Sequence, residues 1–410
     1  MTAAVLALHR RTFRSLREHR NYRLFFLGQA FSVSGSWMQN VALAWLVIEL
    51  TSSPVAVGAL AFCRFLPFTA LGLVAGAVTD RVDVRRLVVW AQAAQMAVSA
   101  ALAVLALSGR ASLPAVYALA VLGGVALVFD APGRQALTYQ LVGPAELPNA
   151  VALNASLFNA SRVVGPALGG VVVATLGVGA CFALNSVSFL AVLAALLSLD
   201  TAALHPVERD GGRSVWAGIG DGLRHVARSR ETAVVLAVVT VLSVVGFNFH
   251  VIVPLLADDT LHVGAETFGL LSACFGLGAL AGALAAAAVG RASWRAFRIG
   301  VLGFSLVMLL LAPVESVAPA AALLFLAGLF FAVLAASANT IVQLRAPGSL
   351  RGRVVGLYLF AFAGLTPIGG LLAGWLVELG GTGLSFAVAG SAGLAAAALA
   401  ARRPGQAARA

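Results

Sequence analysis

Apolar runs of about 20 residues recur along this 410-residue chain and constrain its fold more than any other feature. A helix rises ~1.5 Å per residue, so such a run matches the ~30 Å hydrocarbon core of a bilayer. Sixty per cent of the residues are hydrophobic and only 10% are charged, whereas soluble proteins carry about 25% charged residues. The runs lack the period-two alternation of a transmembrane β-barrel. The sequence therefore predicts an all-α polytopic membrane protein.

The apolar runs divide into twelve predicted transmembrane helices that form two pseudo-symmetric six-helix bundles. A polar stretch lies between the bundles, and its second part, from Trp216 to Arg230, has the apolar and charged faces of an amphipathic helix at the membrane surface. The predicted organisation is a cytoplasmic N-terminal segment (1–21), a first bundle (22–199), a cytoplasmic linker with the amphipathic helix (200–231), a second bundle (232–401) and a cytoplasmic tail (402–410).

The positive charge follows the connectors between these spans. All basic residues except histidines are arginines, and the net charge is +11. If the N-terminus lies inside, the inner connectors and tails hold nearly all the arginines, and the outer connectors hold only Arg110. This pattern predicts a multi-pass protein of the bacterial cytoplasmic membrane with both termini in the cytoplasm. Because the arginines are spread over short connectors, they do not indicate a nucleic-acid partner. We expect a monomer whose partners are the lipid bilayer and a small-molecule substrate.

Pairs of glycines four residues apart mark corresponding spans of the two halves. Glycine lets two helix backbones approach closely in a membrane, and two parallel six-span repeats are a known transporter plan. The sequence therefore predicts contacts between the halves at these positions in the second, fifth, eighth and eleventh spans: Gly72 and Gly76, Gly165 and Gly169, Gly278 and Gly282, Gly370 and Gly374.

The stretch S-R-V-V-G-P-A-L-G-G, from Ser161 to Gly170, combines a charge, a proline and close-packing glycines. Arg162, Gly165, Pro166 and Gly169 fall on one side of a helix at ~100° per residue. An arginine this deep in a bilayer is costly, so it should face protein or a water-filled cavity. Arg162 either neutralises an anionic substrate or lowers the proton affinity of a partner, or it has a structural role or couples the halves. The shared face with the glycines favours a structural or coupling role.

The segment G-A-V-T-D-R-V-D-V-R-R, residues 76–86, resembles the signature loop of the major facilitator superfamily. F-D-A-P-G-R-Q-A (129–136), W-M-Q-N-V-A-L-A-W-L (37–46) and the Ser161–Gly170 stretch resemble bacterial exporters related to the enterobactin and macrolide efflux proteins. The resemblance covers the whole chain. Two residues depart from the general loop, because Asp83 replaces a glycine and Val84 replaces an arginine.

This resemblance implies roles for the loop. A gating network would join Asp80, Arg81, Arg85 and Asp130, with Gly76 and Arg86 completing the loop, and would break as the halves rock. Asp80 could also cap a neighbouring helix N-terminus, where negative charge is favoured. The alternative is that these arginines only set topology. The Gly165–Gly170 segment resembles an antiporter motif, which implies export.

Polar residues within the spans are candidates for a substrate cavity or for proton coupling. By resemblance the cavity is lined by the first, fourth, seventh and tenth spans, and a mainly apolar cavity suits amphiphilic or aromatic substrates. Glu49, His250 and Asp130 are the nearest candidates for carrying a proton. The cavity or coupling candidates are Gln39, Asn40, Glu49, Arg64, Asn248 and His250.

The chain has no P-loop, no G-x-S-x-G, no H-E-x-x-H and no metal-ligand spacing. These absences predict a protein that is not an enzyme and uses no cofactor other than a proton gradient. We expect a secondary transporter that exports a small amphiphilic molecule, of drug or siderophore type, by rocker-switch alternating access. Two alternatives remain: an importer or facilitator of a small metabolite, and a membrane accessory protein that transports nothing.

Overall fold

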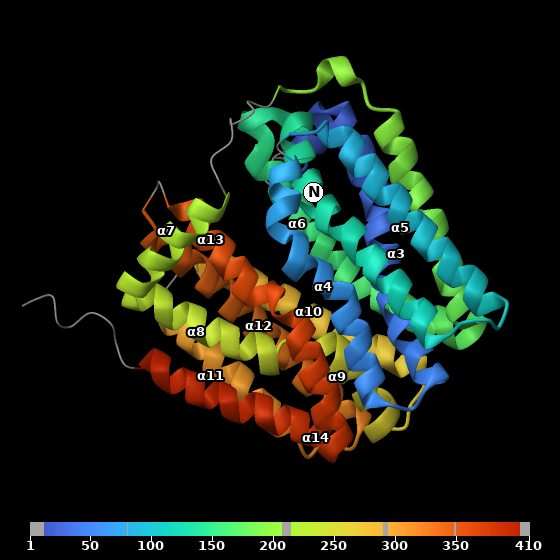
Figure 1. Cartoon of the computed structure of the whole chain (residues 1–410), viewed down its shortest axis with the longest axis vertical. Coiled ribbons are helices and arrows are strands. Elements are labelled where there is room, and N and C mark those ends of the chain that lie inside the picture. Colours follow the sequence, from blue (N-terminus) through green and yellow to red (C-terminus); the bar gives the residue numbers. More distant parts are fainter. Residues whose placement is uncertain (1–11, 80, 207–214, 290–293, 348–349, 402–410) are drawn as a thin grey trace, which may run out of the picture. The chain divides into compact units, whose positions relative to one another are not determined.

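The computed structural model describes residues 12–79, 81–206, 215–289, 294–347 and 350–401 (Figure 1). These residues are almost entirely helical and include no strand. Up to the polar stretch the helices are α2 (Arg14–Glu18), α3 (Arg20–Leu50), α4 (Pro54–Thr79), α5 (Val84–Leu107) and α6 (Leu113–Leu197), and then the short 3-10 turn η1 (Thr201–Ala203). After it come α7 (Val215–Arg228), α8 (Arg230–Val245), α9 (Phe249–Leu255), the π-helical η2 (Leu256–Thr260), α10 (Ala265–Val289), α11 (Trp294–Leu311), α12 (Val317–Arg345), α13 (Arg351–Leu359), the π-helical η3 (Phe360–Gly364) and α14 (Thr366–Ala401).

Glycines divide the two longest helices into separate spans. Gly143 (φ 71°) and Gly177 (φ 82°) interrupt the 85-residue α6, and Gly381 (φ 70°) interrupts α14. Only glycine adopts such a positive φ at little cost. By length and composition, eight helical stretches within the described ranges can cross a membrane. With the two long stretches divided at their glycines and α3 added, the helices are consistent with the twelve predicted spans.

The chain forms two compact units, which we describe separately. Unit 1 consists of Met1–Ala42 and Ala70–Gly211. In this unit α5 packs against α6, around a core that includes Tyr22, Phe25 and Phe189. Buried aromatic and aliphatic side chains of this kind supply most of the packing energy available within a span bundle.

Unit 2 consists of Leu43–Thr69 and Gly212–Ala410. Here α10 packs against α12, and α14 packs against α8 and α11. Residues 43–69, which the sequence assigned to the first bundle, therefore group with the second half of the chain. The physical reason is a close backbone approach, since a Cβ built on Gly58 would lie 2.7 Å from the carbonyl oxygen of Gly370.

Two spans of unit 2 are interrupted. The seventh predicted span breaks between α8 and α9, where Gly246 ends one helix and Asn248 precedes the next. The eleventh contains η3, between α13 and α14. π-Helical segments inside α-helices are frequent at functional sites, and both interruptions lie near residues of the candidate site.

Candidate functional site

Asp130 is the centre of a buried polar network in unit 1. Its side chain is only 2% exposed, and its Oδ2 lies 2.8 Å from Nε of Arg134, one helical turn further along α6. Gln92 Nε2 donates to Asp130 Oδ1 at 2.8 Å. Arg134 Nη1 donates to Gln29 Oε1 at 2.9 Å, and Ser32 Oγ donates to Gln92 Oε1 at 3.2 Å. We call these residues the Asp130 network. It combines one carboxylate and one guanidinium with two amides and a hydroxyl group.

The structure corrects the predicted partner of Asp130. Arg85 does not reach it, because its Nε donates to the carbonyl oxygen of Leu196 at 2.8 Å and its Nη2 to that of Leu197 at 3.3 Å. Carbonyl groups at the end of a helix lack intrahelical partners and attract a nearby cation. Arg85 therefore binds the C-terminal end of α6 and not the carboxylate of Asp130.

The structure describes the rest of the signature loop except Asp80. Asp83 caps α5, because its Oδ1 accepts a hydrogen bond from the backbone N–H of Arg86 at 2.9 Å. Arg81 and Arg86 are exposed. Asp80, the predicted centre of the gating network, lies outside the described residues. The departure from the general loop noted in the sequence, Asp83, thus has a definite structural role.

The glycines of the fifth span lie against α3 of the same unit. A Cβ on Gly165 would be 2.8 Å from the carbonyl oxygen of Ser34, and one on Gly169 would be 3.0 Å from that of Met38. Gly170 and Pro166 are also buried. The prediction that this face meets the other half is therefore wrong for Gly165 and Gly169. The face is a close-packing surface as predicted, but its partner is a helix of its own bundle.

Arg162 lies on the same surface. Its guanidinium carbon is 5.5 Å from the centre of the Trp37 ring, and the Trp37 ring meets Phe158 edge-on at 5.6 Å. A guanidinium over an aromatic face is attracted by the ring quadrupole. The structure thus gives Arg162 a partner on α3 within unit 1.

The other predicted glycine contacts divide into two groups. Gly278 and Gly282 on α10 approach the backbone carbonyls of Phe325 and Leu329 on α12, so their predicted contact between halves is wrong because their neighbours lie in the same half. Gly374 approaches the carbonyl oxygen of Pro54, at 2.6 Å from a built Cβ. Gly370 and Gly374 on α14 therefore do contact a helix of the first half, namely α4. Apart from the neighbouring turns of α4 itself, no heavy atom of the described residues lies within 4 Å of a Cβ built on Gly72 or on Gly76.

Three of the candidates for a cavity or for proton coupling lie on α3. Gln39 Oε1 accepts hydrogen bonds from Ser99 Oγ and, at 2.7 Å, from Asn185 Nδ2, which joins α3, α5 and α6. Asn40 has a buried Oδ1 without a hydrogen-bond partner among the described residues. Glu49 is exposed at the end of α3. Gln39 is therefore part of the packing of unit 1, and Asn40 retains an unused acceptor.

Unit 2 brings Arg64 and His250 together around one aromatic ring. The Arg64 guanidinium carbon is 5.9 Å from the centre of the Phe65 ring, and the His250 ring meets Phe65 edge-on at 5.1 Å. His250 is exposed and Arg64 is partly exposed. Within the described residues no carboxylate forms an ion pair with Arg64. A cation in the middle of a span must face protein or water, so this corner provides a positive charge that can meet an anionic group.

Aromatic side chains continue from this corner along the broken seventh span. Phe247 lies 5.0 Å from Phe331 and 5.4 Å from Phe362, measured between ring centres, and Phe249 lies 4.0 Å from Phe275. All but Phe275 are partly exposed. We call Phe247, Phe249, Phe331 and Phe362 the aromatic wall. The sequence predicted a mainly apolar cavity but not this set of rings, because Phe362 belongs to η3 and Phe247 lies in the break between α8 and α9.

Asn248 connects the two interruptions. Its Nδ2 donates to the carbonyl oxygen of Val244 at 2.9 Å, and a Cβ on Gly369 would lie 2.8 Å from its Oδ1. Ser243 Oγ donates to the carbonyl oxygen of Phe362 at 2.9 Å. These bonds satisfy backbone groups that the breaks leave without helical partners. Asn248, predicted to line a cavity, is fully buried and holds the break together.

A second polar cluster, which sequence reasoning missed, lies before the first span. Arg14 Nε is 3.2 Å from Glu146 Oε1, and Ser15 Oγ donates to Asn149 Oδ1 at 2.8 Å. The Glu18 hydrogen bond and the Glu146 charge raise the pKa of Arg14 above its usual value. The backbone N–H of His205 donates to the carbonyl oxygen of Gln140 at 2.8 Å, and its ring covers Gly143. The Gly143–Pro144 pair was the sequence signal that could have located this cluster, since a glycine followed by a proline marks a break in an apolar run.

An all-helical chain of this kind, with paired multi-span units, interrupted helices and polar groups buried in its spans, has the features of a membrane transporter. The family model of transmembrane secretion effectors matches residues 11–406, and the chain belongs to this exporter branch of the major facilitator superfamily.

Curated relatives agree with this assignment. The multidrug efflux pump Tap of Mycolicibacterium fortuitum is 28% identical over 86% of this chain and 88% of its own length. The staphyloferrin A transporter of Staphylococcus aureus is 24% identical over 63% of this chain and 64% of its own length, so the chain matches somewhat less than two thirds of that relative. Macrolide efflux protein A of Streptococcus pyogenes is 22% identical over 66% of this chain and 67% of its own length.

Solved structures match the fold. The nucleoside transporter NupG superimposes with a TM-score of 0.69 and 14% identity, over 93% of this chain and 98% of that one. A bacterial homologue of the iron transporter ferroportin, in an inward-facing state, gives a TM-score of 0.72 and 18% identity, over 93% and 98%. These similarities confirm the predicted fold class.

Proposed function

We propose that this protein exports a small amphiphilic molecule across the bacterial cytoplasmic membrane by alternating access, as a monomer, without enzymatic activity or cofactor, and with both termini in the cytoplasm. The observation that carries the proposal is the combination in unit 2 of the aromatic wall with the Arg64–His250 corner. The names of the multidrug, macrolide and siderophore relatives support it.

The chemistry of this site suits an amphiphile. Partly exposed phenylalanine rings bind apolar or aromatic parts of a ligand through their faces and edges. Arg64 adds a charge that can bind a carboxylate, phosphate or phenolate, while His250 adds a donor or acceptor. A mainly apolar site with few polar groups can bind molecules of varied shape, provided that each has an apolar part and an anionic group.

We assign proton coupling to the Asp130 network. Asp130 is a carboxylate buried inside a span of unit 1, and it is held by Arg134 and Gln92. Protonation would remove its charge and weaken the pair with Arg134, which alters the packing between α3, α5 and α6. In this scheme a proton that enters from outside binds Asp130 and changes the packing of unit 1. The substrate is released from its site in unit 2.

The test is transport by the purified full chain in proteoliposomes against a panel of anionic, neutral and cationic amphiphiles, with and without a pH gradient. Export is supported if an inward proton gradient drives substrate the opposite way. Substrate movement along its own gradient without any effect of pH would favour an importer or facilitator. Absence of movement for every compound, together with intact folding, would favour an accessory protein.

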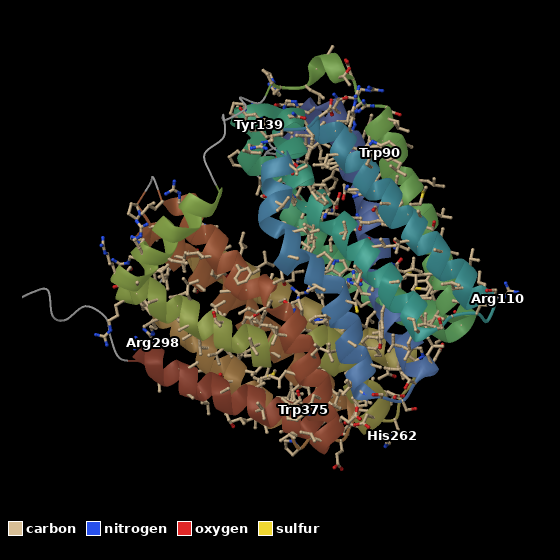
Figure 2. The ribbon with its side chains drawn as sticks, viewed as in Figure 1. Trp90, Arg110, Tyr139, His262, Arg298 and Trp375 are labelled. Atoms are coloured by element: carbon tan, nitrogen blue, oxygen red, sulfur yellow. The ribbon has the colours of Figure 1, made fainter. Side chains whose placement is uncertain are left out.

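Arg64→Gln is the matched variant for the substrate site, and Arg110→Gln is its control, because Arg110 is exposed outside the spans (Figure 2). We expect the apparent affinity of the Arg64 variant for anionic substrates to fall by about tenfold, because one ionic contact is lost. Its affinity for neutral and cationic compounds should change less. Equal loss for all compounds would contradict a direct contact between Arg64 and the substrate.

A further inference from the structure

A groove away from the substrate site lies between α11 and α14. These helices pack side by side (Figure 1), and the groove between them has a volume of about 470 Å³. Arg295 and Arg298 lie at one end of it, in the first turns of α11, where Figure 2 labels Arg298. The walls are formed by Ile299, Leu302, Leu394 and Ala398. We call this feature the α11/α14 groove.

The groove has two chemically different parts. The arginine end carries two guanidinium groups, and the first turn of α11 has no acidic residue. Within the described residues neither Arg295 nor Arg298 forms an ion pair with a carboxylate. The N–H groups at the start of α11 also point toward this end and add a partial positive charge. This end therefore favours an anion with several acceptor oxygens.

The walls behind the arginines are apolar and open. Ile299 is 48% exposed, Leu302 is 47% exposed and Leu394 is 38% exposed. Ile299 and Leu302 follow Arg298 along α11, and Leu394 faces the groove from α14, so together they form a strip next to the charge. In a spanning helix such a strip contacts hydrocarbon chains. A volume of about 470 Å³ falls in the range ~300–1,000 Å³ of small-ligand sites.

We infer that the α11/α14 groove binds one anionic phospholipid, with its phosphate between Arg295 and Arg298 and an acyl chain along Ile299, Leu302 and Leu394. The arginines lie at the end of α11 that the charge pattern puts on the cytoplasmic side, so the lipid belongs to the cytoplasmic leaflet. Basic pockets between spanning helices on this side favour anionic head groups, at ~1 kcal/mol per arginine. Arginine side chains at the end of a span reach the head-group level readily.

A whole lipid fits the groove better than a head group, because a head group alone would occupy only the arginine end. A free phosphate would use the arginines and leave the apolar strip without an occupant. A neutral apolar substrate would use the strip and leave two arginines without an anion. Only an amphiphilic anion of the bilayer satisfies both parts, and anionic phospholipid is the abundant molecule of this chemistry next to the groove.

The experiment is native mass spectrometry of the full chain, purified in mild detergent and titrated with phosphatidylglycerol, cardiolipin or phosphatidylethanolamine. We expect the wild type to retain one anionic lipid and little phosphatidylethanolamine. The double variant Arg295→Gln, Arg298→Gln should bind it roughly thirtyfold more weakly, as follows from about 1 kcal/mol for each arginine. Ala398→Phe, which fills the exposed wall and keeps both arginines, should also lose the lipid.

The matched control is Arg17→Gln, Arg20→Gln, which removes two exposed arginines from the same predicted side of the membrane but lies in unit 1. It should retain the lipid. Equal binding by wild type and the Arg295/Arg298 variant would overturn the proposal, as would equal loss in the control, which would indicate general electrostatic attraction. Displacement of the lipid by millimolar inorganic phosphate would overturn the two-part site, and displacement by the exported substrates would assign the groove to them instead.

Discussion

At the residue scale, sequence reasoning found important side chains but not their partners. Asp130 was identified as a titratable group inside a span, and it is buried as expected. Its predicted partners were Arg81 and Arg85, but Arg81 is exposed and Arg85 binds helix-end carbonyls instead. Arg134 is the actual partner because it lies four residues further along α6, on the same helix face. That spacing was visible in the sequence, whereas the distance between α5 and α6 side chains was not.

Replacing Asp130 by Asn tests its assignment to proton coupling. The amide keeps the size of the side chain but cannot release a proton, so transport driven by a pH gradient should fall to near background while substrate exchange without a gradient continues. Both rates are measured in the same proteoliposomes. Asp130→Glu is the control and should recover part of the driven transport. Unchanged pH-driven transport by Asp130→Asn would exclude this carboxylate as the proton carrier.

Glycine positions allow a second test at the same scale. A Cβ on Gly165 would lie 2.8 Å from the Ser34 carbonyl oxygen, whereas a Cβ on Gly72 would have no described neighbour within 4 Å outside its own helix. Gly165→Ala should therefore destabilise the protein by ~1–3 kcal/mol through overpacking. Gly72→Ala should stabilise it by ~0.5–1 kcal/mol, because glycine is a poor helix residue. Thermal unfolding in detergent measures both, and similar midpoints would contradict the α3 contact.

At the element scale, apolar runs predict spans well and their interruptions poorly. Hydropathy averages over a window, so the break before α9 and the π-helical η3 remain hidden within continuous apolar sequence. They become visible only through the bonds that stabilise them, such as Ser243 to the Phe362 carbonyl. The aromatic wall was missed for the same reason. The cap of α5 was not predicted either, although Asp83 precedes this helix as a capping residue should.

Removing the Asp83 cap should loosen the start of α5. Asp83→Ala takes away the acceptor for the Arg86 N–H and should cost ~1 kcal/mol, whereas Asp83→Ser retains an acceptor and should cost less. Hydrogen exchange of the first turn of α5 is the direct measurement. The same protection in Asp83→Ala as in the unmodified chain would show that the cap contributes nothing there.

At the scale of the whole molecule, the sequence predicted spans that are consistent with the helices of the structure, but not how these spans group. Glycine pairs indicated where backbones approach without indicating which helix they approach. Gly165 and Gly278 meet helices of their own bundle, whereas Gly370 and Gly374 meet α4. Residues 43–69 consequently group with unit 2. No local pattern specifies such a partner, because small residues fit any close neighbour.

The α4 contact should be sensitive to added volume. A Cβ on Gly374 would lie 2.6 Å from the Pro54 carbonyl oxygen, but a Cβ on Gly356 would meet none of the described residues within 4 Å outside its own helix. Gly374→Leu should separate α14 from α4 and reduce both the unfolding temperature and the transport rate. Gly356→Leu, in the same predicted span, should affect both less. Equal behaviour of the two variants would contradict a tight α4–α14 contact.

The α4 contact also has a consequence for how the chain is made. Synthesis proceeds from the N-terminus, and the parts of a chain fold in that order. Gly58 leaves the ribosome early, but its partners Gly370 and Gly374 belong to one of the last spans to be inserted. The start of α4 must therefore remain in the membrane without its final neighbour while most of the chain is translated. Lipid or an insertion factor has to cover this surface until then. Assembly of unit 2 is therefore complete only after α14 has been inserted.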